Sequence, residues 1–199
     1  MALTLGAPAR PDRSAPGSAG AGVAVQSAAV GQVAVTVLGR ARELRTLLER
    51  LEHGHAVVQG DAGVGKTTVV RRVVAELREA GRGVHDAVAT SAAASVPFGP
   101  LLSLLPPDRD RLGTMTDASA ARQLLAELTR VGPRPVLVVD DAHLLDDPTA
   151  TVVFEAARSG TVQVLVALRA GEPVPDAIAA LWRDVGAEVV ELDALSLSQ

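Results

Sequence analysis

The stretch GDAGVGKTT decides how the rest of the sequence is interpreted; it comprises Gly60, Asp61, Ala62, Gly63, Val64, Gly65, Lys66, Thr67 and Thr68. Its first eight residues fit the pattern G-x-x-x-x-G-K-[ST] without a mismatch. The apolar run HAVVQG ends at its first glycine, and a helical pattern follows it with Val69, Val70, Val73, Val74 and Leu77 on one face. The sequence therefore predicts a strand, a glycine loop and a helix in this order.

The residue types in this stretch indicate a site for phosphate. Glycines let successive backbone N–H groups point at an anion, and a helix that begins near Gly65 adds the positive end of its dipole. Lys66 is the only lysine beside 18 arginines. A compact ammonium suits a closed loop better than a branched guanidinium does, so Lys66 is expected to reach the β- and γ-phosphates. The Thr67 hydroxyl offers a ligand to Mg²⁺, and all of Gly60 to Thr68 is expected to bind nucleotide.

A second group of candidate residues lies in VLVVDDAHLLDD, about 75 residues further on. Asp140 ends an apolar strand, where its carboxylate suits the outer shell of Mg²⁺. Asp141 is a candidate catalytic residue that orients or deprotonates water, the alternative being a loop acid that caps a helix. His143 is interpreted as a structural hydrogen-bonding residue. Arg169, at the end of VQVLVALR, is a candidate contact of the γ-phosphate, with a solvated strand end as the alternative.

Apolar strands that alternate with amphipathic helices predict an α/β fold. Strands buried on both faces are typical of a parallel sheet, so we expect a three-layer sandwich with five parallel strands. The glycine loop resembles that of P-loop NTPases, and this resemblance implies the strand order 5-1-4-3-2. One expected helix begins at Asp117 and places Ala121, Leu124, Leu125, Leu128 and Val131 on one face.

The composition excludes several classes of protein. The absence of cysteine rules out disulfides and thiolate chemistry, and fits a cytoplasmic location. A net charge of −4 with dispersed arginines gives no basic footprint for nucleic acid. Residues 20–39 lack charge, but their glycines and glutamines argue against a membrane span.

The motifs also distinguish between families of nucleotide-binding proteins. RecA-like ATPases need an acid after the second strand, GTP-binding proteins need N-K-x-D, and ABC ATPases need an LSGGQ-like signature; none of these is present. The segments VTVLGRARELRTLLERL, VPFGPLLSLLP, VLVVDDAHLLD and VLVALRAGEPVP resemble the N-terminal AAA/STAND-type ATPase domain of large, MalT-like LuxR-type transcriptional regulators. The resemblance implies ATP or ADP with Mg²⁺ as ligands, and Gly39 and Arg40 beside the adenine.

The resemblance covers roughly residues 35–195 and suggests how the chain is organised. We expect a disordered leader rich in Ala, Gly, Pro and Ser over 1–32, a P-loop ATPase domain over 33–195, and the truncated start of a helical lid over 196–199. The family's helix-turn-helix is missing, so no direct DNA-binding element is expected. Ala167 stands where many relatives have threonine, which weakens the case for hydrolysis.

The favoured interpretation is a nucleotide switch with slow or absent hydrolysis. A carboxylate one methylene shorter than glutamate at position 141 would hold the attacking water less well. A second interpretation is a non-enzymatic interaction module that associates with itself or with full-length relatives. A small-molecule P-loop kinase is the third, and the scarcity of basic residues over 170–199 argues against it.

Overall fold

The computed structural model describes residues 39–104 and 117–194, all within the unit Val35–Gln199. The leader expected over 1–32 and the lid start expected over 196–199 lie outside the described residues, so these boundaries stay predictions. Within the described ranges, no helix is long and apolar enough to cross a membrane.

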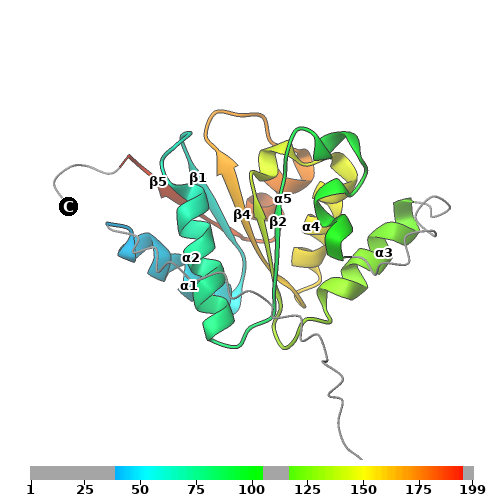
Figure 1. The fold of residues 1–199 in the computed structure, drawn as a ribbon, viewed down its shortest axis with the longest axis horizontal. Coiled ribbons are helices and arrows are strands. Elements are labelled where there is room, and N and C mark those ends of the chain that lie inside the picture. Colours follow the sequence, from blue (N-terminus) through cyan, green and yellow to red (C-terminus); the bar gives the residue numbers. More distant parts are fainter. Residues whose placement is uncertain (1–38, 105–116, 195–199) are drawn as a thin grey trace, which may run out of the picture. The chain divides into compact units, whose positions relative to one another are not determined.

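Five parallel strands form one sheet in the order β2-β3-β4-β1-β5, which confirms the expected 5-1-4-3-2 order (Figure 1). The strands are β1 (Ala56–Gly60), β2 (Val84–Val88), β3 (Val136–Asp140), β4 (Gln163–Arg169) and β5 (Glu188–Leu192). The strand that carries the glycine loop, β1, lies between β4 and β5. Since β4 separates β1 from β3, the glycine loop and Asp140 follow strands that are not adjacent.

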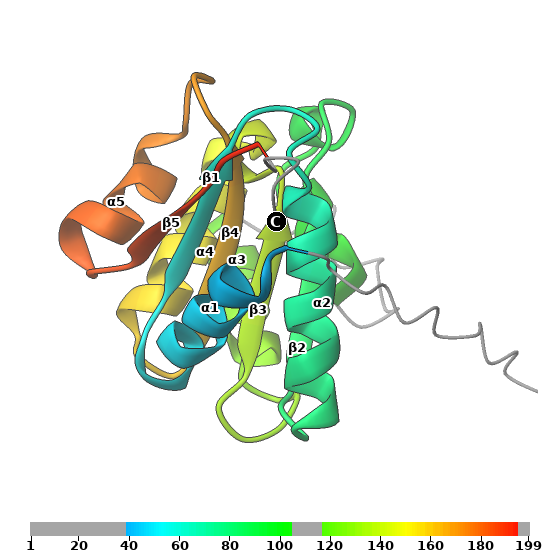
Figure 2. The ribbon, with the colours of Figure 1, turned by 90° about the vertical axis from the view of Figure 1, so that its left-hand side faces the viewer.

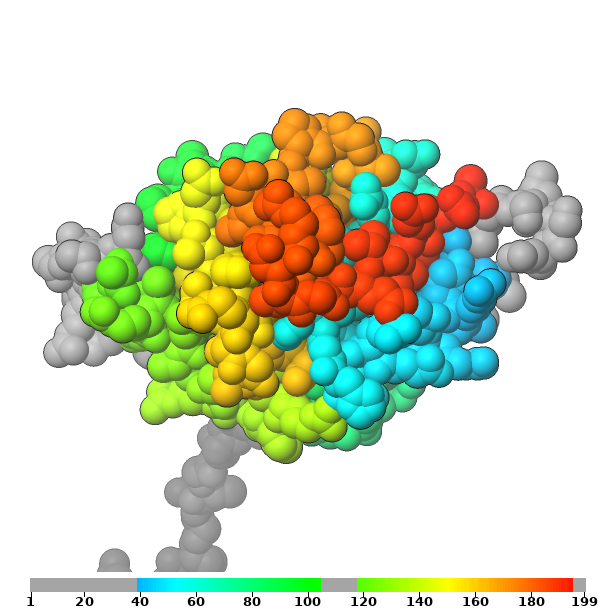
Figure 3. Space-filling model, turned by 180° about the vertical axis from the view of Figure 1, so that it is seen from behind, coloured from blue at the N-terminus to red at the C-terminus, as the bar shows by residue number. Residues whose placement is uncertain are grey.

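Helices cover both faces of the sheet, which confirms the three-layer sandwich (Figures 1 and 2). On one face lie α1 (Ala41–His53) and α2 (Lys66–Glu79), and on the other lie α3 (Asp117–Leu128), α4 (Asp147–Arg158) and α5 (Asp176–Asp184). Seen from behind, α4 and α5 lie side by side with β5 next to them (Figure 3). Short 3-10 helices span Ala93–Ser95 (η1), Gly99–Leu104 (η2) and Ala142–Leu144 (η4).

Side chains of β4 show how the strand pattern builds two cores. Leu165 and Ala167 are buried against α1 and α2, whereas Val164, Val166 and Leu168 are buried against the opposite helices. Successive side chains of a strand point to opposite faces, so a strand covered on both sides must be apolar at every position. This is why the uninterrupted apolar runs in the sequence predicted central strands correctly.

The expected helical face that ends at Val131 is wrong at its last position. The helix α3 ends at Leu128, and Val131 is 43% exposed. The chain has to turn there into β3: Gly132 adopts a φ of +128°, and Pro133 follows it. A glycine with a positive φ and a proline both stop a helix. The helix therefore ends before Val131, although the 3.6-residue apolar pattern includes this residue.

His55 joins elements at the amino ends of the strands and makes stability depend on pH. Its Nδ1 accepts a hydrogen bond from the Val164 N–H at 3.1 Å. Burial lowers the pKa of His55 from its ordinary value of 6.5, and a hydrogen bond with the Ala157 backbone opposes this shift only in part. Burial also lowers the pKa of His85 on β2. The folded state therefore binds these protons less readily than the unfolded state does.

We expect the free energy of unfolding to include a contribution from both histidines that is fully present above pH 6.5. This contribution is lost as the pH falls through their lower folded-state pKa values. Thermal unfolding measured from pH 7.5 to 5 should show a smaller loss of stability for His55→Gln than for the unchanged chain, because glutamine does not titrate in this range. The glutamine side chain can still accept from the Val164 N–H, which preserves the local structure. The exposed His53 supplies the control: His53→Gln should keep the original slope, and an equal slope in His55→Gln would contradict the assignment.

Candidate functional site

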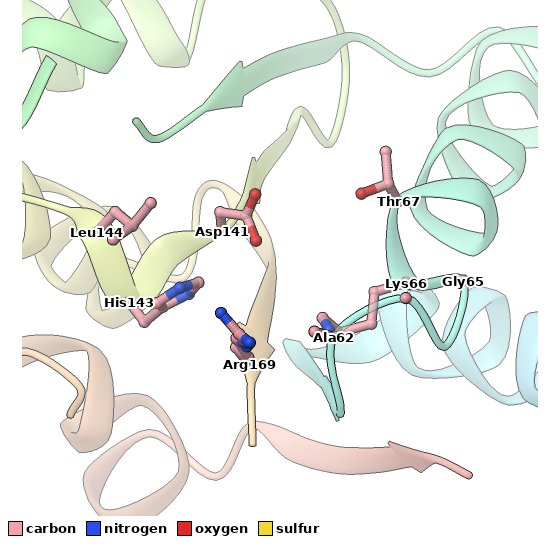
Figure 4. A pocket seen from close by; sticks show the side chains of 9 residues that line it. Ala62, Gly65, Lys66, Thr67, Asp141, His143, Leu144 and Arg169 are labelled. Carbon is pink, nitrogen blue, oxygen red and sulfur yellow. The ribbon is translucent and has the colours of Figure 1, made fainter. Parts of the chain in front are cut away.

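A cavity of about 440 Å³ opens at the carboxyl edge of the sheet (Figure 4). One wall comes from the glycine loop and the start of α2, and the other from the turn after β3 and the end of β4. Its lining residues are Ala62, Gly63, Gly65, Lys66, Thr67, Asp141, His143, Leu144 and Arg169. The structure thus brings together the loop and both candidate catalytic residues, Asp141 and Arg169, which the sequence carries about 75 and 100 residues apart.

The glycines of the loop are required by its backbone. Gly63 and Gly65 have φ angles of +77° and +99°, which side-chain-bearing residues rarely adopt. A Cβ added to Gly60 would lie 2.6 Å from the Leu192 carbonyl oxygen, so β1 also needs glycine where it leaves the sheet. Gly65 is the N-cap of α2, and no side chain caps this helix end. The first N–H groups of α2 therefore keep their hydrogen-bonding capacity for an anion.

Lys66 is 7% exposed, and its ammonium is bound by the loop itself. Its Nζ donates to the carbonyl oxygens of Gly60 at 2.9 Å and Asp61 at 2.8 Å. A buried ammonium needs such partners, since its desolvation is otherwise costly. The side chain holds the loop in shape while it lines the cavity, and Thr67 lines the cavity beside it.

The two adjacent aspartates have different environments. Asp140 is 5% exposed, and its Oδ1 accepts the N–H of Asp141 at 3.0 Å; Asp140 is not among the residues that line the cavity. Asp141 lines the cavity and adopts a φ of +53°. This left-handed conformation is uncommon for a residue other than glycine, although Asp and Asn tolerate it best. Backbone strain of this kind tends to occur at functional sites, where it aims a side chain.

Arg169 reaches the cavity from the last position of β4. Its side chain is 48% exposed and lies 3.5 Å from the Glu172 carboxylate, a weak and solvent-screened pair. Ala167, two residues earlier, is fully buried against α1 and α2 rather than exposed at the cavity.

The residues expected near adenine lie outside this cavity. Arg40 is 5% exposed and donates to the Glu43 carboxylate at 3.0 Å, to the Val64 carbonyl at 3.4 Å, and to the carbonyl of Asp193. Gly39, with a φ of +81°, precedes it. Arg40 thus ties the start of α1 to the glycine loop and to the end of β5. The adenine contact of Gly39 and Arg40 stays a prediction.

Not all of the loop faces the main cavity. Gly60 and Asp61 line a separate cavity of about 200 Å³ next to β5, together with Glu191 and Asp193. Val64 and Thr68 line neither of the two cavities.

Sequence reasoning missed two lining residues, His143 and Leu144. His143 was interpreted as a structural residue, yet it makes no hydrogen bond with the described residues, and its Nδ1 is buried without a partner there. The signal was its position two residues after Asp141, on the same turn. Helix capping, the alternative role considered for Asp141, belongs to Asp146. Its carboxylate accepts a hydrogen bond from the Thr149 N–H at 2.9 Å at the start of α4.

The chain is similar to known proteins in its sequence profile and in its fold. A family profile described as the AAA ATPase domain matches residues 36–168. Similar solved structures include the Aeropyrum pernix ORC1 protein in complex with DNA, with 17% identity and a TM-score of 0.56 over 79% of this chain and 46% of that chain. The Pif1 helicase from Candida albicans has 19% identity and a TM-score of 0.54 over 78% of this chain and 40% of that chain.

Domain III of the Thermotoga maritima replication initiation protein DnaA has 15% identity and a TM-score of 0.50 over 78% of this chain and 62% of that domain. At these identities the likeness concerns the fold alone. The chain spans less than half of the length of the ORC1 and Pif1 structures. No curated protein matches the chain. The family profile covers more than half of the chain and ends at the strand that carries Arg169; the chain belongs to the AAA ATPase domain family.

Proposed function

We propose that the chain binds ATP or ADP with Mg²⁺ in the 440 Å³ cavity and works as a nucleotide switch with slow hydrolysis. The observation that carries the proposal is the uncapped start of α2, which opens into this cavity opposite Asp141 and Arg169. A polyphosphate placed there would accept hydrogen bonds from the backbone N–H groups of the loop and from the ammonium of Lys66.

The residues present also fit a magnesium ion. Thr67 offers a hydroxyl and the two aspartates offer carboxylates, and Mg²⁺ prefers such oxygen ligands together with water. The metal would neutralise charge on the phosphates. Asp140, fixed through its bond to the Asp141 N–H, would hold the outer shell of the ion, while Asp141 would orient water beside the terminal phosphate.

The switch part of the proposal rests on the hydrogen bonds that the loop makes with the Lys66 and Arg40 side chains. A phosphate that attracts the Lys66 ammonium competes with the carbonyl oxygens of Gly60 and Asp61. Arg40 joins the Val64 carbonyl of the same loop to the carbonyl of Asp193. A change in the loop would therefore reach the end of β5. The proposal includes the setting implied by the sequence: the ATPase domain of a LuxR-type regulator, in the cytoplasm, that associates with itself or with full-length relatives.

Substitution of Lys66 tests nucleotide binding. We expect Lys66→Ala to weaken the binding of a fluorescent ATP analogue with Mg²⁺ by about 100-fold or more, since a buried charged contact to phosphate is lost. Lys66→Arg should also weaken it, because the branched guanidinium does not fit the closed loop. The exposed Arg71 on α2 supplies the matched control, Arg71→Ala, which should bind normally. Equal affinity of Lys66→Ala and the unchanged chain would contradict the proposal.

Substitution of Asp141 tests hydrolysis. Asparagine tolerates the positive φ at this position, so Asp141→Asn removes the charge and keeps the backbone. We expect slow phosphate release from the unchanged chain and a fall of about 100-fold, or to background, in the variant, with ATP binding retained. The exposed Asp147 gives the control Asp147→Asn. Phosphate release that stays at background in the unchanged chain, despite ATP binding, would favour the non-enzymatic interaction module.

The switch predicts different amide hydrogen exchange with ADP and with a non-hydrolysable ATP analogue. We expect the analogue to alter exchange around Val64 and around Asp193 more than ADP does. Arg40→Ala should keep the response at the loop and lose it at Asp193, whereas Arg42→Ala, an exposed neighbour on α1, should keep both. Identical exchange with the two nucleotides in the unchanged chain would exclude the switch.

A further inference from the structure

The outer face of α1 carries four exposed, charged side chains in one stripe. A helix turns by about 100° per residue, so positions 42, 45, 49 and 52 lie within about 80° of one another around its axis. Leu47 and Leu51 are buried on the other side of the helix, in the core shared with α2. Figure 2 shows α1 in front of the sheet, beside α2. The charged stripe comprises Arg42, Arg45, Glu49 and Glu52.

The stripe has almost no partners within the described part of the chain. The side chains of Arg42, Arg45 and Glu49 make no ion pair or hydrogen bond there. Glu52 lies 3.5 Å from Arg134, and both side chains are more than half exposed. Such an exposed pair contributes little to stability. The four charges are therefore available to another molecule.

The order of the charges on the stripe opposes the helix dipole. Arg42 and Arg45 lie in the first half of α1, toward the positive end of the dipole, and Glu49 and Glu52 lie in the second half. The reverse order stabilises a helix, and a glutamate four residues after an arginine forms the weaker orientation of such a pair. The stripe does not serve the stability of α1, which favours a role in contact with a partner.

The stripe is complementary to a second copy of itself. Leu47 is its midpoint, since Arg45 and Glu49 are each two residues away and Arg42 and Glu52 are each five residues away. When two such helices pack antiparallel with their midpoints level, every arginine lies opposite a glutamate of the other copy. In a parallel pair, like charges would meet instead. The antiparallel arrangement uses the same patch on both copies, as a twofold axis requires.

We propose that two copies of the chain associate through an antiparallel pair of α1 helices. Arg42 then meets Glu52 of the second copy, and Arg45 meets Glu49 of the second copy. This pairing rests on the self-association included in the proposed function, to which it adds the surface and the symmetry. A helix of 13 residues is about 20 Å long, so the contact is small and polar. The dimer is weak and forms at low ionic strength, since salt screens exposed ion pairs.

Sedimentation velocity of the full chain at rising concentration tests the proposal. The unchanged chain should form a dimer at about 50 mM salt and be monomeric at about 500 mM. Arg42→Glu with Arg45→Glu makes the stripe wholly acidic, and Glu49→Arg with Glu52→Arg makes it wholly basic. Each double variant should dimerise at least about tenfold more weakly, because like charges then face each other. An equal mixture of the two should form a dimer, since an acidic stripe meets a basic one.

The variant with all four exchanges separates a contact from damage to the fold. It restores the complementarity in reverse order, so it should dimerise as the unchanged chain does. Arg71→Glu with Arg122→Glu reverses two exposed charges outside the stripe, on α2 and α3, and should leave the dimer intact. An unchanged chain that stays monomeric at low salt would overturn the proposal. Full dimerisation of the acidic variant, or no recovery in the fourfold variant, would overturn it as well.

Nucleotide binding provides a separate readout, because the stripe lies outside the cavity. All of these variants should bind a fluorescent ATP analogue with the affinity of the unchanged chain. Loss of the dimer with nucleotide binding retained supports the helix pair. A dimer without nucleotide binding would sink the proposed nucleotide site and leave this pairing in place.

Discussion

The register of β1 against its two neighbours is the constraint on which the site depends. Gly60 pairs with Arg169 of β4 on one side and with Leu192 of β5 on the other. The Gly60 carbonyl also accepts the N–H of Ala170 at 3.0 Å, so the loop leaves the sheet at a fixed height. Because the strands are parallel, every functional segment emerges at the same edge. A shift of one residue would turn the alternating side chains of β1 to the wrong layers and move the loop away from Arg169.

Features of local pattern could be predicted from the sequence. The motif Gly60–Thr68 is contiguous, and the apolar runs and helical faces indicate which side chains are buried. The strand order and the layers then followed from the architecture that this motif is typical of. Residue type and place in the loop or at a strand end singled out Lys66, Asp141 and Arg169, and all three line the cavity. Their roles stay predictions. The helix expected over 117–131 shows the limit, since the apolar pattern runs to Val131 although the helix ends at Leu128, ahead of the turn at Gly132.

Contacts between distant segments could not be predicted. The partners of Arg40 are backbone carbonyls of Val64 and Asp193, and any residue type could supply them. The positive φ of Asp141 arises from its turn and has no signature in residue type beyond the tolerance of aspartate. For His143, a structural histidine and one that lines a cavity look the same in sequence, and only the fold places this side chain at the cavity.

The central position of β1 has a consequence for how the chain acquires its site during synthesis. The loop is translated early, but its strand is held between two strands made much later, and even the bond from Val164 to His55 spans 109 residues. Contacts this remote in sequence form only after a large loss of chain entropy, which slows folding. A nascent chain that has not yet emerged as far as β4 carries the complete motif without the strands that fix the shape of the loop. The shape of the loop is therefore a property of the finished sheet and not of the motif alone.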